Sequence, residues 1–318
     1  MSTIFKGIVR LRSRLYEKGY LESRELSHPV VSVGNLTVGG TGKTPLVIAL
    51  AGGFRELGYR PVVLSRGYRR RSRGVVVVSR GNGPEVDWSM AGDEPFLIAQ
   101  RLSGVSVVVG RDRFEAGRRA QSDGLGDLFI LDDGFQHRQL SRNCDIVAID
   151  PDDWNGEERL LPRGHWREPR SALGRADAVC FRREPGTKAL AFDLPAFEFT
   201  INVDGIFRDG EPVDARSLGN EPVTAFAGIA GPERFFETVR SLGLNVVGTK
   251  SFPDHHPFRP AEIASLGNGH RITTEKDAVR LGSGDFLTLR VSANILSYES
   301  LRDLVLERIG PRVIPLGS

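Results

Sequence analysis

From residue 30 onward, short apolar runs alternate with stretches in which apolar residues recur every three or four positions. Apolar runs rich in valine, isoleucine and leucine are typical of strands buried on both faces, and the periodic stretches between them are typical of helices. This alternation predicts an α/β fold, a parallel sheet with helices on both faces. The expected strands are 30–33, 61–64, 105–109, 128–131, 145–149 and 178–181, with an edge strand at 75–78, and the expected helices are 45–57, 94–102 and 112–121.

The pattern changes after residue 184. Residues 190–213 alternate apolar and polar side chains and contain two Asp-Gly pairs, which predicts a small antiparallel element between two domains. Beyond it, strands and helices alternate again, so that a second, smaller α/β unit follows. We therefore expect a basic N-terminal helix at 1–18, a larger α/β domain at 19–184, a β linker at 185–215 and the smaller domain at 216–318.

The N-terminal segment has an amphipathic pattern. Ile4, Ile8, Leu11 and Leu15 share one face of the expected helix, and the other face is basic. Such a pattern is typical of a helix in a membrane interface, with lysine and arginine near anionic headgroups. It equally fits a helix packed on the core of the protein with a solvated basic face, and the pattern alone does not separate the two.

The first expected strand leads into a glycine-rich turn and then a helix, and residues 35–44 read NLTVGGTGKT. This context is that of a phosphate-binding loop, in which main-chain N–H groups and the helix N-terminus meet phosphate oxygens. Lys43 would reach the β- and γ-phosphates, and Thr44 would ligate Mg²⁺. The general motif has glycine where this chain has Thr37. The expected nucleotide-binding residues are Thr37, Val38, Gly39, Gly40, Thr41, Gly42, Lys43 and Thr44.

Composition places the chain among soluble globular proteins, with 318 residues, 40% of them hydrophobic and 26% charged. No apolar run approaches the ~20 residues of a membrane span. With two cysteines, 36 positions apart, the chain is expected to lack a disulfide framework and to suit a reducing cytoplasm. The net charge is only +3, but the sequence pI is about 9 and arginines are clustered. This indicates an anionic partner, which could be nucleic acid, an anionic membrane surface or a phosphorylated substrate.

Carboxylates follow the expected strand at 128–131. Asp132 and Asp133 lie where phosphate-loop enzymes carry a carboxylate that holds Mg²⁺, directly or through water. An Asp-Gly turn closing the strand also explains the pair, but the phosphate loop upstream favours the metal. The pattern does not say which of the two carboxylates touches the metal.

A kinase also needs a carboxylate or histidine near the attacking hydroxyl. Asp93 is one candidate, although its place before an expected helix is explained as well by an N-cap. Asp254 and His255 are the others, because an adjacent carboxylate can hold a histidine in one tautomer, as a general base or as the partner of another carboxylate. Without further context, residues 254–255 also fit a plain surface loop.

Three stretches could contact a substrate. The arginine-rich loop that begins at Arg66 and contains Tyr68 suits phosphate recognition. Residues 160–169 include an exposed-looking Trp166, and could meet a sugar or a phosphate or simply connect two elements. Residues 273–277 are explained by a strand end and a capped helix. Weaker candidates are Gln136 and His137, which follow the paired carboxylates, and Arg167.

Taken together, seven segments resemble, in order, the tetraacyldisaccharide 4′-kinases of lipid A biosynthesis. Thr37 is the usual residue of the phosphate loop in that family. Residues 163–166 differ from it, because the family more often has small and apolar residues there. The N-terminal segment is shorter and more basic than the apolar anchor of some relatives, which favours a helix lying on the membrane. The matching segments are 33–45, 64–68, 92–95, 132–137, 161–169, 252–255 and 274–278.

The resemblance implies transfer of the ATP γ-phosphate to the 4′-hydroxyl of a tetraacyl-glucosamine-disaccharide 1-phosphate. It implies Mg²⁺ as cofactor, no nucleic-acid partner, and a peripheral position on the cytoplasmic face of the inner membrane of a Gram-negative bacterium. Asp93 would activate the hydroxyl, assisted by His255 beside Asp254. The implied site comprises Lys43 and these three as catalytic residues, Thr44, Asp132, Asp133 and Glu94 at the metal, and Arg66, Tyr68, Gln136, His137 and Arg167 at the acceptor.

Two other functions use part of the same pattern. A membrane-associated switch ATPase or GTPase without a small-molecule acceptor would need the phosphate loop, the paired carboxylates and the basic helix. It would leave Asp93 and the 254–255 pair without a role. A nucleic-acid-binding NTPase would use the arginine loop, but the chain does not show the pattern of aromatic residues interleaved among arginines that such binding uses.

Overall fold

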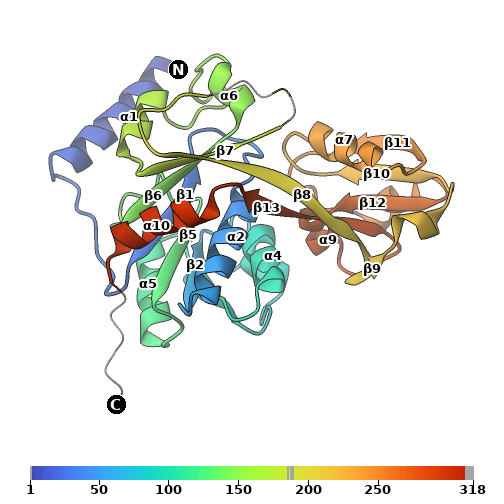
Figure 1. Cartoon of the computed structure of the whole chain (residues 1–318), viewed down its shortest axis with the longest axis horizontal. Coiled ribbons are helices and arrows are strands. Elements are labelled where there is room, and N and C mark those ends of the chain that lie inside the picture. The colour runs from blue at the N-terminus through green and yellow to red at the C-terminus, as the bar shows by residue number, and fades with distance from the viewer. Residues whose placement is uncertain (1, 185, 187–189, 312–318) are drawn as a thin grey trace.

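The computed structural model describes residues 2–184, 186 and 190–311. Within these residues, thirteen strands form a continuous, mostly parallel sheet in the order β11-β10-β12-β13-β8-β7-β6-β1-β5-β2-β4-β3, with β9 paired to β8. Figure 1 shows that this sheet runs through two lobes, a larger one that contains β1 to β7 and a smaller one that contains β10 to β12. The predicted α/β fold with helices on both faces of a parallel sheet is confirmed.

The larger lobe buries its strands on both faces. Val31 and Val33 of β1 face one core together with helices α2, α4 and α10, and Val30 of the same strand faces another core together with α5. Edge strand β3 is antiparallel to β4, the strand that follows it in the chain. The strands are β1 (Val30–Asn35), β2 (Pro61–Ser65), β3 (Val76–Arg80), β4 (Ser106–Val109), β5 (Leu128–Asp132), β6 (Cys144–Ile149) and β7 (Ala178–Arg182).

Helices cover this part of the sheet. Helix α2 begins directly after the glycine-rich turn, and α4 begins directly after Gly92. The larger lobe contains α1 (Ser2–Glu17), α2 (Lys43–Glu56), α3 (Trp88–Ala91), α4 (Asp93–Arg101), α5 (Arg113–Ser122), α6 (Pro151–Asn155) and the 3₁₀ helix η1 (Arg170–Arg175).

The smaller lobe has its own apolar core. Phe235, Phe236 and Val239 of α7 pack against Ala225 of β10 and Ile272 of β12. The elements are η2 (Ala215–Leu218), β10 (Val223–Ala227), α7 (Glu233–Ser241), β11 (Val246–Ser251), α8 (Pro260–Ala264), β12 (His270–Thr274) and α9 (Glu275–Leu281).

A long antiparallel pair joins the lobes. β8 (Ala196–Arg208) is parallel to β7 at its start and antiparallel to β13 (Leu287–Ile295), and β9 (Glu211–Val213) folds back on its end. Figure 1 shows β8 crossing from one lobe to the other. The expected linker at 185–215 is therefore largely a strand of the sheet. Its residues 185 and 187–189 lie outside the described residues.

The last helix, α10 (Tyr298–Ile309), returns to the larger lobe. Leu301 and Val305 are fully buried in the core that contains Val31 and Val33. Because β13 runs antiparallel to β8, the chain leaves the sheet beside the larger lobe. The apolar side of α10 is therefore buried against that lobe. The boundary expected for the smaller domain at 216–318 is thus wrong for this helix; residues 312–318 lie outside the described residues.

Helix α1 lies against the loop that follows β5. Arg12 donates to the carbonyl of Gln136 at 3.1 Å, and the Arg138 guanidinium lies 4.7 Å from the ring centre of Tyr16. Leu11, however, leaves 59% of its side chain exposed. The helix therefore contacts the protein and still presents an apolar side chain to its surroundings. Among the described residues, no helix is both long and apolar enough to span a membrane.

Candidate active site

The glycine-rich turn has the geometry of a phosphate-binding loop. It leaves β1 after Asn35 and enters α2 at Lys43, and Gly42 caps the helix with φ +81°. A Cβ at Gly42 would lie 2.9 Å from the ring of Phe199, so that both the backbone conformation and the packing require glycine there. The turn thus leads directly into a helix N-terminus, which is a feature that anion binding uses.

Asp153 and residues 165–166 contact the start of the phosphate loop. The hydroxyl of Thr37 donates to the Asp153 carboxylate at 2.6 Å, and the N–H of Val38 donates to the carbonyl of His165 at 2.7 Å. Trp166 pairs with Thr37 through the main chain and is only 1% exposed. The expectation of an exposed tryptophan is therefore wrong, because its ring fills the core beside Leu36. Thr37 turns its side chain toward α6, which explains why a hydroxyl is useful at this position.

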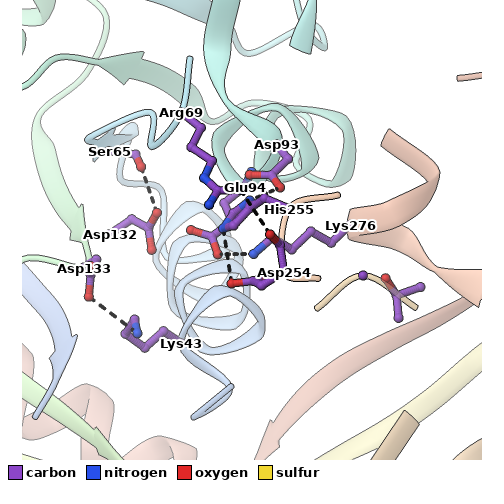
Figure 2. Close-up of polar contacts among 12 residues, drawn as sticks. Lys43, Ser65, Arg69, Asp93, Glu94, Asp132, Asp133, Asp254, His255 and Lys276 are labelled. Atoms are coloured by element: carbon purple, nitrogen blue, oxygen red, sulfur yellow. Dashed lines mark hydrogen bonds and ion pairs between the residues drawn. The ribbon is translucent and has the colours of Figure 1, made fainter. Parts of the chain in front are cut away.

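The two carboxylates after β5 have different surroundings. Asp132 is 2% exposed and accepts a hydrogen bond from the Ser65 hydroxyl at 2.9 Å. Asp133 accepts from Arg167 at 2.7 and 2.8 Å and lies 3.5 Å from the Lys43 ammonium (Figure 2). β1, β2 and β5 are parallel neighbours, so their carboxyl ends bring these groups to one edge of the sheet.

These surroundings shift the two pKa values in opposite directions. Burial and the negative charges of Glu94 and Asp133 raise the pKa of Asp132 to about 7. Burial also acts on Asp133, but the charges of Lys43 and Arg167 outweigh it and hold its pKa well below the usual range. Asp133 is thus already paired with cations, whereas Asp132 is a buried carboxylate that a further cation would stabilise.

Asp93 lies in the first turn of α4 and does not serve as its N-cap, which is Gly92. It is 4% exposed, and its Oδ2 lies 2.7 Å from Nδ1 of His255 and 2.8 Å from Arg280. Burial acts to raise the pKa of Asp93, but the hydrogen bond from His255 and the charges of Lys276, His255 and Arg280 hold it below its usual value. Asp93 is therefore an ionised, oriented carboxylate.

Close packing of two glycines, Gly67 and Gly92, sets the position of Asp93. Gly67 and Gly92 have φ of +64° and +93°, and a Cβ on Gly92 would lie 3.0 Å from the Cα of Gly67. A Cβ on Gly67 would lie 2.6 Å from the carbonyl of Ala91. Because neither glycine carries a side chain, the arginine-rich loop packs directly on the start of α4.

Of the two carboxylates considered as partners of His255, the structure places Asp93 in direct contact with it. Its Nε2 lies 3.6 Å from Asp254, beyond hydrogen-bond distance, whereas its Nδ1 contacts Asp93 directly. Arg69 donates to the carbonyl of Asp254 at 3.1 Å, and the ring of Tyr68 lies 5.3 Å from that of His255. The arginine-rich loop of the larger lobe thus meets the histidine loop of the smaller lobe (Figure 2).

The expected acceptor residues fall into two groups. Arg66 and Tyr68 are exposed beside the site. Gln136 donates to the Asn35 carbonyl at 2.8 Å, and Arg167 is paired with Asp133. Nε2 of His137 accepts from the N–H of Arg113 at 3.3 Å, and burial, with the charge of Arg113, lowers the pKa of His137 to about 4.

Sequence reasoning missed the roles of three cations. Lys276 of α9 lies 2.9 Å from Glu94, and Arg280 of the same helix reaches Asp93. Arg113 is 5% exposed at the start of α5; burial lowers its pKa to about 10, and the nearby charges of Asp133 and Asp132 only partly oppose this. Lys276 lies in segment 274–278, which matches the kinase family, but a strand end and a capped helix were enough to explain that segment. No signal in one sequence separates Arg280 or Arg113 from other helical arginines.

The fold and site together define a P-loop nucleotide-dependent phosphotransferase. A cradle for a triphosphate, a carboxylate suited to a divalent cation and a buried Asp–His pair meet at one place. The family model described as tetraacyldisaccharide-1-P 4′-kinase, LpxK, matches residues 1–310, and the chain belongs to this family. The resemblance predicted from the seven segments is confirmed.

Individual relatives agree. The chain is 41% identical over 293 residues to the tetraacyldisaccharide 4′-kinase of Pelobacter propionicus, covering 88% of this chain and 81% of that protein. It is 39% identical to the enzyme of that name from Geobacter sulfurreducens, covering 98% and 92%. A crystal structure of LpxK from Aquifex aeolicus in complex with ATP superposes with a TM-score of 0.85, at 35% identity and 97% coverage of both chains. These matches favour a kinase over a switch ATPase.

Proposed function

We propose that the chain transfers the γ-phosphate of ATP to the 4′-hydroxyl of a tetraacylated glucosamine disaccharide 1-phosphate, in Mg²⁺-dependent fashion. Family membership supports the reaction, and one observation supports the site: the phosphate loop and the Asp93–His255 pair belong to one continuous cluster of charged side chains. Glu94 lies between the two, paired with Lys276 and close enough to Asp132 to raise its pKa.

On the phosphate side, main-chain amides of the loop, apart from that of Val38, which donates to His165, would surround the triphosphate. Lys43 would neutralise its β- and γ-phosphates. Asp133, which Arg167 also contacts, lies 3.5 Å from the Lys43 ammonium and would hold it in place before nucleotide binds. Such prior orientation favours catalysis, because the charges need not reorganise as phosphate transfers.

The residues around Asp132 fit a magnesium ion. Asp132 is buried and its pKa is raised. Among the described residues, the Ser65 hydroxyl is the one group that donates a hydrogen bond to this carboxylate, at Oδ2. Oxygen ligands of this kind, completed by water and phosphate oxygens, are those that Mg²⁺ prefers. Asp132, Glu94 and Thr44 would hold the ion, which when bound would neutralise charge on the transferring phosphate. Asp133 is less suited, since two cations already contact it.

On the proton side, Asp93 with His255 would take up the proton of the attacking hydroxyl. A hydrogen-bonded carboxylate–imidazole pair is a common arrangement for general base catalysis. The pair is buried, Asp93 at 4% and His255 at 10% side-chain exposure, so bulk water is largely kept from it. Arg66 and Tyr68, which stay exposed beside it, would contact the acceptor.

The acceptor is an anionic amphiphile, and α1 suits the surface where it resides. The helix is basic, and Leu11 is open to its surroundings. Apolar insertion together with basic residues near anionic headgroups would hold the enzyme at the cytoplasmic face of the inner membrane as a peripheral protein.

Incubating the purified protein with Mg²⁺, γ-labelled ATP and the lipid disaccharide tests the proposal directly. We expect label on the 4′-oxygen of the sugar and little hydrolysis without acceptor. Hydrolysis that proceeds equally well without the disaccharide, with no labelled lipid, would instead support a switch ATPase.

A further inference from the structure

The start of α9 carries a buried polar network that the proposed mechanism does not use. Asp277 is fully buried and accepts from the N–H of Gly228 at 3.0 Å and from the hydroxyl of Thr274 at 2.8 Å. Arg280 follows three positions later, on the same face of the helix, and donates to Asp277. A capped helix would need Thr274 alone. The other two residues therefore call for a different explanation.

Arg280 joins this network to the active site. Its side chain is 2% exposed, and Nη1 donates to Oδ2 of Asp93 at 2.8 Å. Nη2 donates to the carbonyl of Gly228 at 2.8 Å and to Asp277. One planar guanidinium thus contacts two buried carboxylates and a main-chain carbonyl, an arrangement that the single ammonium of lysine cannot reproduce.

The same carbonyl holds the other member of the catalytic pair. The N–H of His255 donates to the Gly228 carbonyl at 3.0 Å. A Cβ on Gly228 would lie 3.1 Å from the ring of Phe258 and 3.2 Å from the carbonyl of Pro253, so the histidine loop packs closely on this glycine. Arg280 therefore contacts the Asp93 carboxylate and the main-chain atom that locates His255.

We propose that Arg280 is a positioning residue for phosphoryl transfer, which fixes Asp93 of the larger lobe and His255 of the smaller lobe in their relative orientation. This inference rests on the proposed function. Asp277 and Thr274 hold the guanidinium in place, and Asp277 balances the part of its charge that Asp93 does not. In this role Arg280 does not touch the nucleotide or the acceptor itself; it acts on them through Asp93 and His255.

Two substitutions test this role. Arg280→Met removes the charge and keeps an unbranched apolar side chain, and Arg280→Lys keeps the charge but loses the fork. We expect kcat to fall by about 10²-fold for Arg280→Met and about tenfold for Arg280→Lys, since displacement of a catalytic group by about 1 Å has effects of this size. The KM for ATP should change by less than about threefold, because the phosphate loop is untouched.

Arg271→Met is the matched control. Arg271 lies on β12 of the same lobe and pairs with Asp285, whose side chain is 80% exposed. The same chemical change there should leave kcat near the wild-type value. A loss of kcat in Arg271→Met equal to that in Arg280→Met would overturn the proposal, since any arginine of this lobe would then have the same effect.

A double-mutant cycle separates positioning from general support of the fold. If Arg280 acts through Asp93, Arg280→Met should lower kcat by no more than about twofold in an Asp93→Asn background. The same fold loss in both backgrounds would show that Arg280 acts independently of Asp93. Should Arg280→Met not fold, Arg280→Lys in both backgrounds gives the same comparison. Wild-type protein that phosphorylates no disaccharide overturns the proposed function itself, whereas active wild type with unimpaired Arg280 variants overturns only the positioning role.

Discussion

The phosphate side and the proton side of this site are built in contrasting ways. In the proposed mechanism, the phosphate side comes from ten consecutive residues, 35–44, whose main chain would do most of the binding. The proton side joins Asp93 to His255, 162 positions later, and to Arg280, 187 positions later. A main-chain cradle tolerates a side-chain change such as Thr37 in place of glycine. The proton side has no such tolerance, because each contact depends on a particular side chain from one of two lobes.

A substitution confined to the proton side should have the largest effect. We expect Asp93→Asn to lower kcat by about 10³-fold, the range of general base catalysis, with ATP affinity unchanged. Steady-state kinetics and calorimetric ATP binding measure the two quantities. Asp87→Asn is the control, because Asp87 is an exposed N-cap of the neighbouring helix α3 and should leave kcat intact. A parallel loss of ATP affinity in Asp93→Asn would mean that this residue supports the fold.

A substitution on the phosphate side should affect binding and turnover together. We expect Lys43→Met to lower kcat by about 10²-fold and to raise the KM for ATP. Loss of one preorganised hydrogen-bond donor that stabilises a developing negative charge has an effect of this size on kcat. Lys250→Met, on an exposed part of β11, is the control. Unchanged ATP affinity in Lys43→Met would place the triphosphate away from this loop and remove the distinction between the two sides.

The paired carboxylates should respond to pH with opposite signs in metal-free protein. The pKa of Asp132 is raised to about 7, so folding favours its protonated form, and stability is lost as pH rises from about 4 through 7. Asp132→Asn removes this loss and should raise the Tm at pH 8 by several degrees, and by less at pH 5, where only part of the loss has occurred. Differential scanning calorimetry at both pH values measures this.

Asp133→Asn is the matched variant. The pKa of Asp133 lies below its usual range, so its ionised form stabilises the fold above the unfolded-state pKa. This substitution should lower the Tm at pH 8, and the difference should shrink as pH falls below about 4. Equal shifts in Tm for the two variants at pH 8 would contradict the opposite pKa shifts of Asp132 and Asp133. Added Mg²⁺ with ATP should raise the Tm of wild type more than that of Asp132→Asn.

The smallest effect on the chemistry should come from α1, which belongs to neither side. Leu11→Glu should weaken binding to vesicles rich in anionic phosphatidylglycerol by about tenfold, as loss of part of one leucine's burial predicts. Leu57→Glu, at the exposed C-cap of α2, is the control. In detergent micelles, kcat should be unchanged in both variants. Vesicle binding that is unaffected by Leu11→Glu would make α1 an element of the protein's own packing.

Local patterns were enough to predict the main elements. Buried strands such as β5 are continuous apolar runs, and α2 follows a glycine turn that only a few sequences can form. They were not enough to predict where α10 packs, since its apolar side fits either lobe. The course of β13 along β8 decides that. Trp166 likewise looked exposed in a polar stretch, and becomes buried because that stretch folds over the phosphate loop.

By itself, the sequence determined the phosphate loop, the carboxylates after β5 and the family, because those features depend on neighbouring residues and on the order of short segments. Tertiary structure alone decided that Nδ1 of His255 contacts Asp93 directly while Asp254 stays 3.6 Å from its Nε2. It also decided that Arg280 contacts Asp93 and the Gly228 carbonyl, to which the N–H of His255 donates. The physical reason is distance along the chain. A hydrogen bond between residues more than 160 positions apart depends on how two lobes share one sheet, and no local pattern encodes that arrangement.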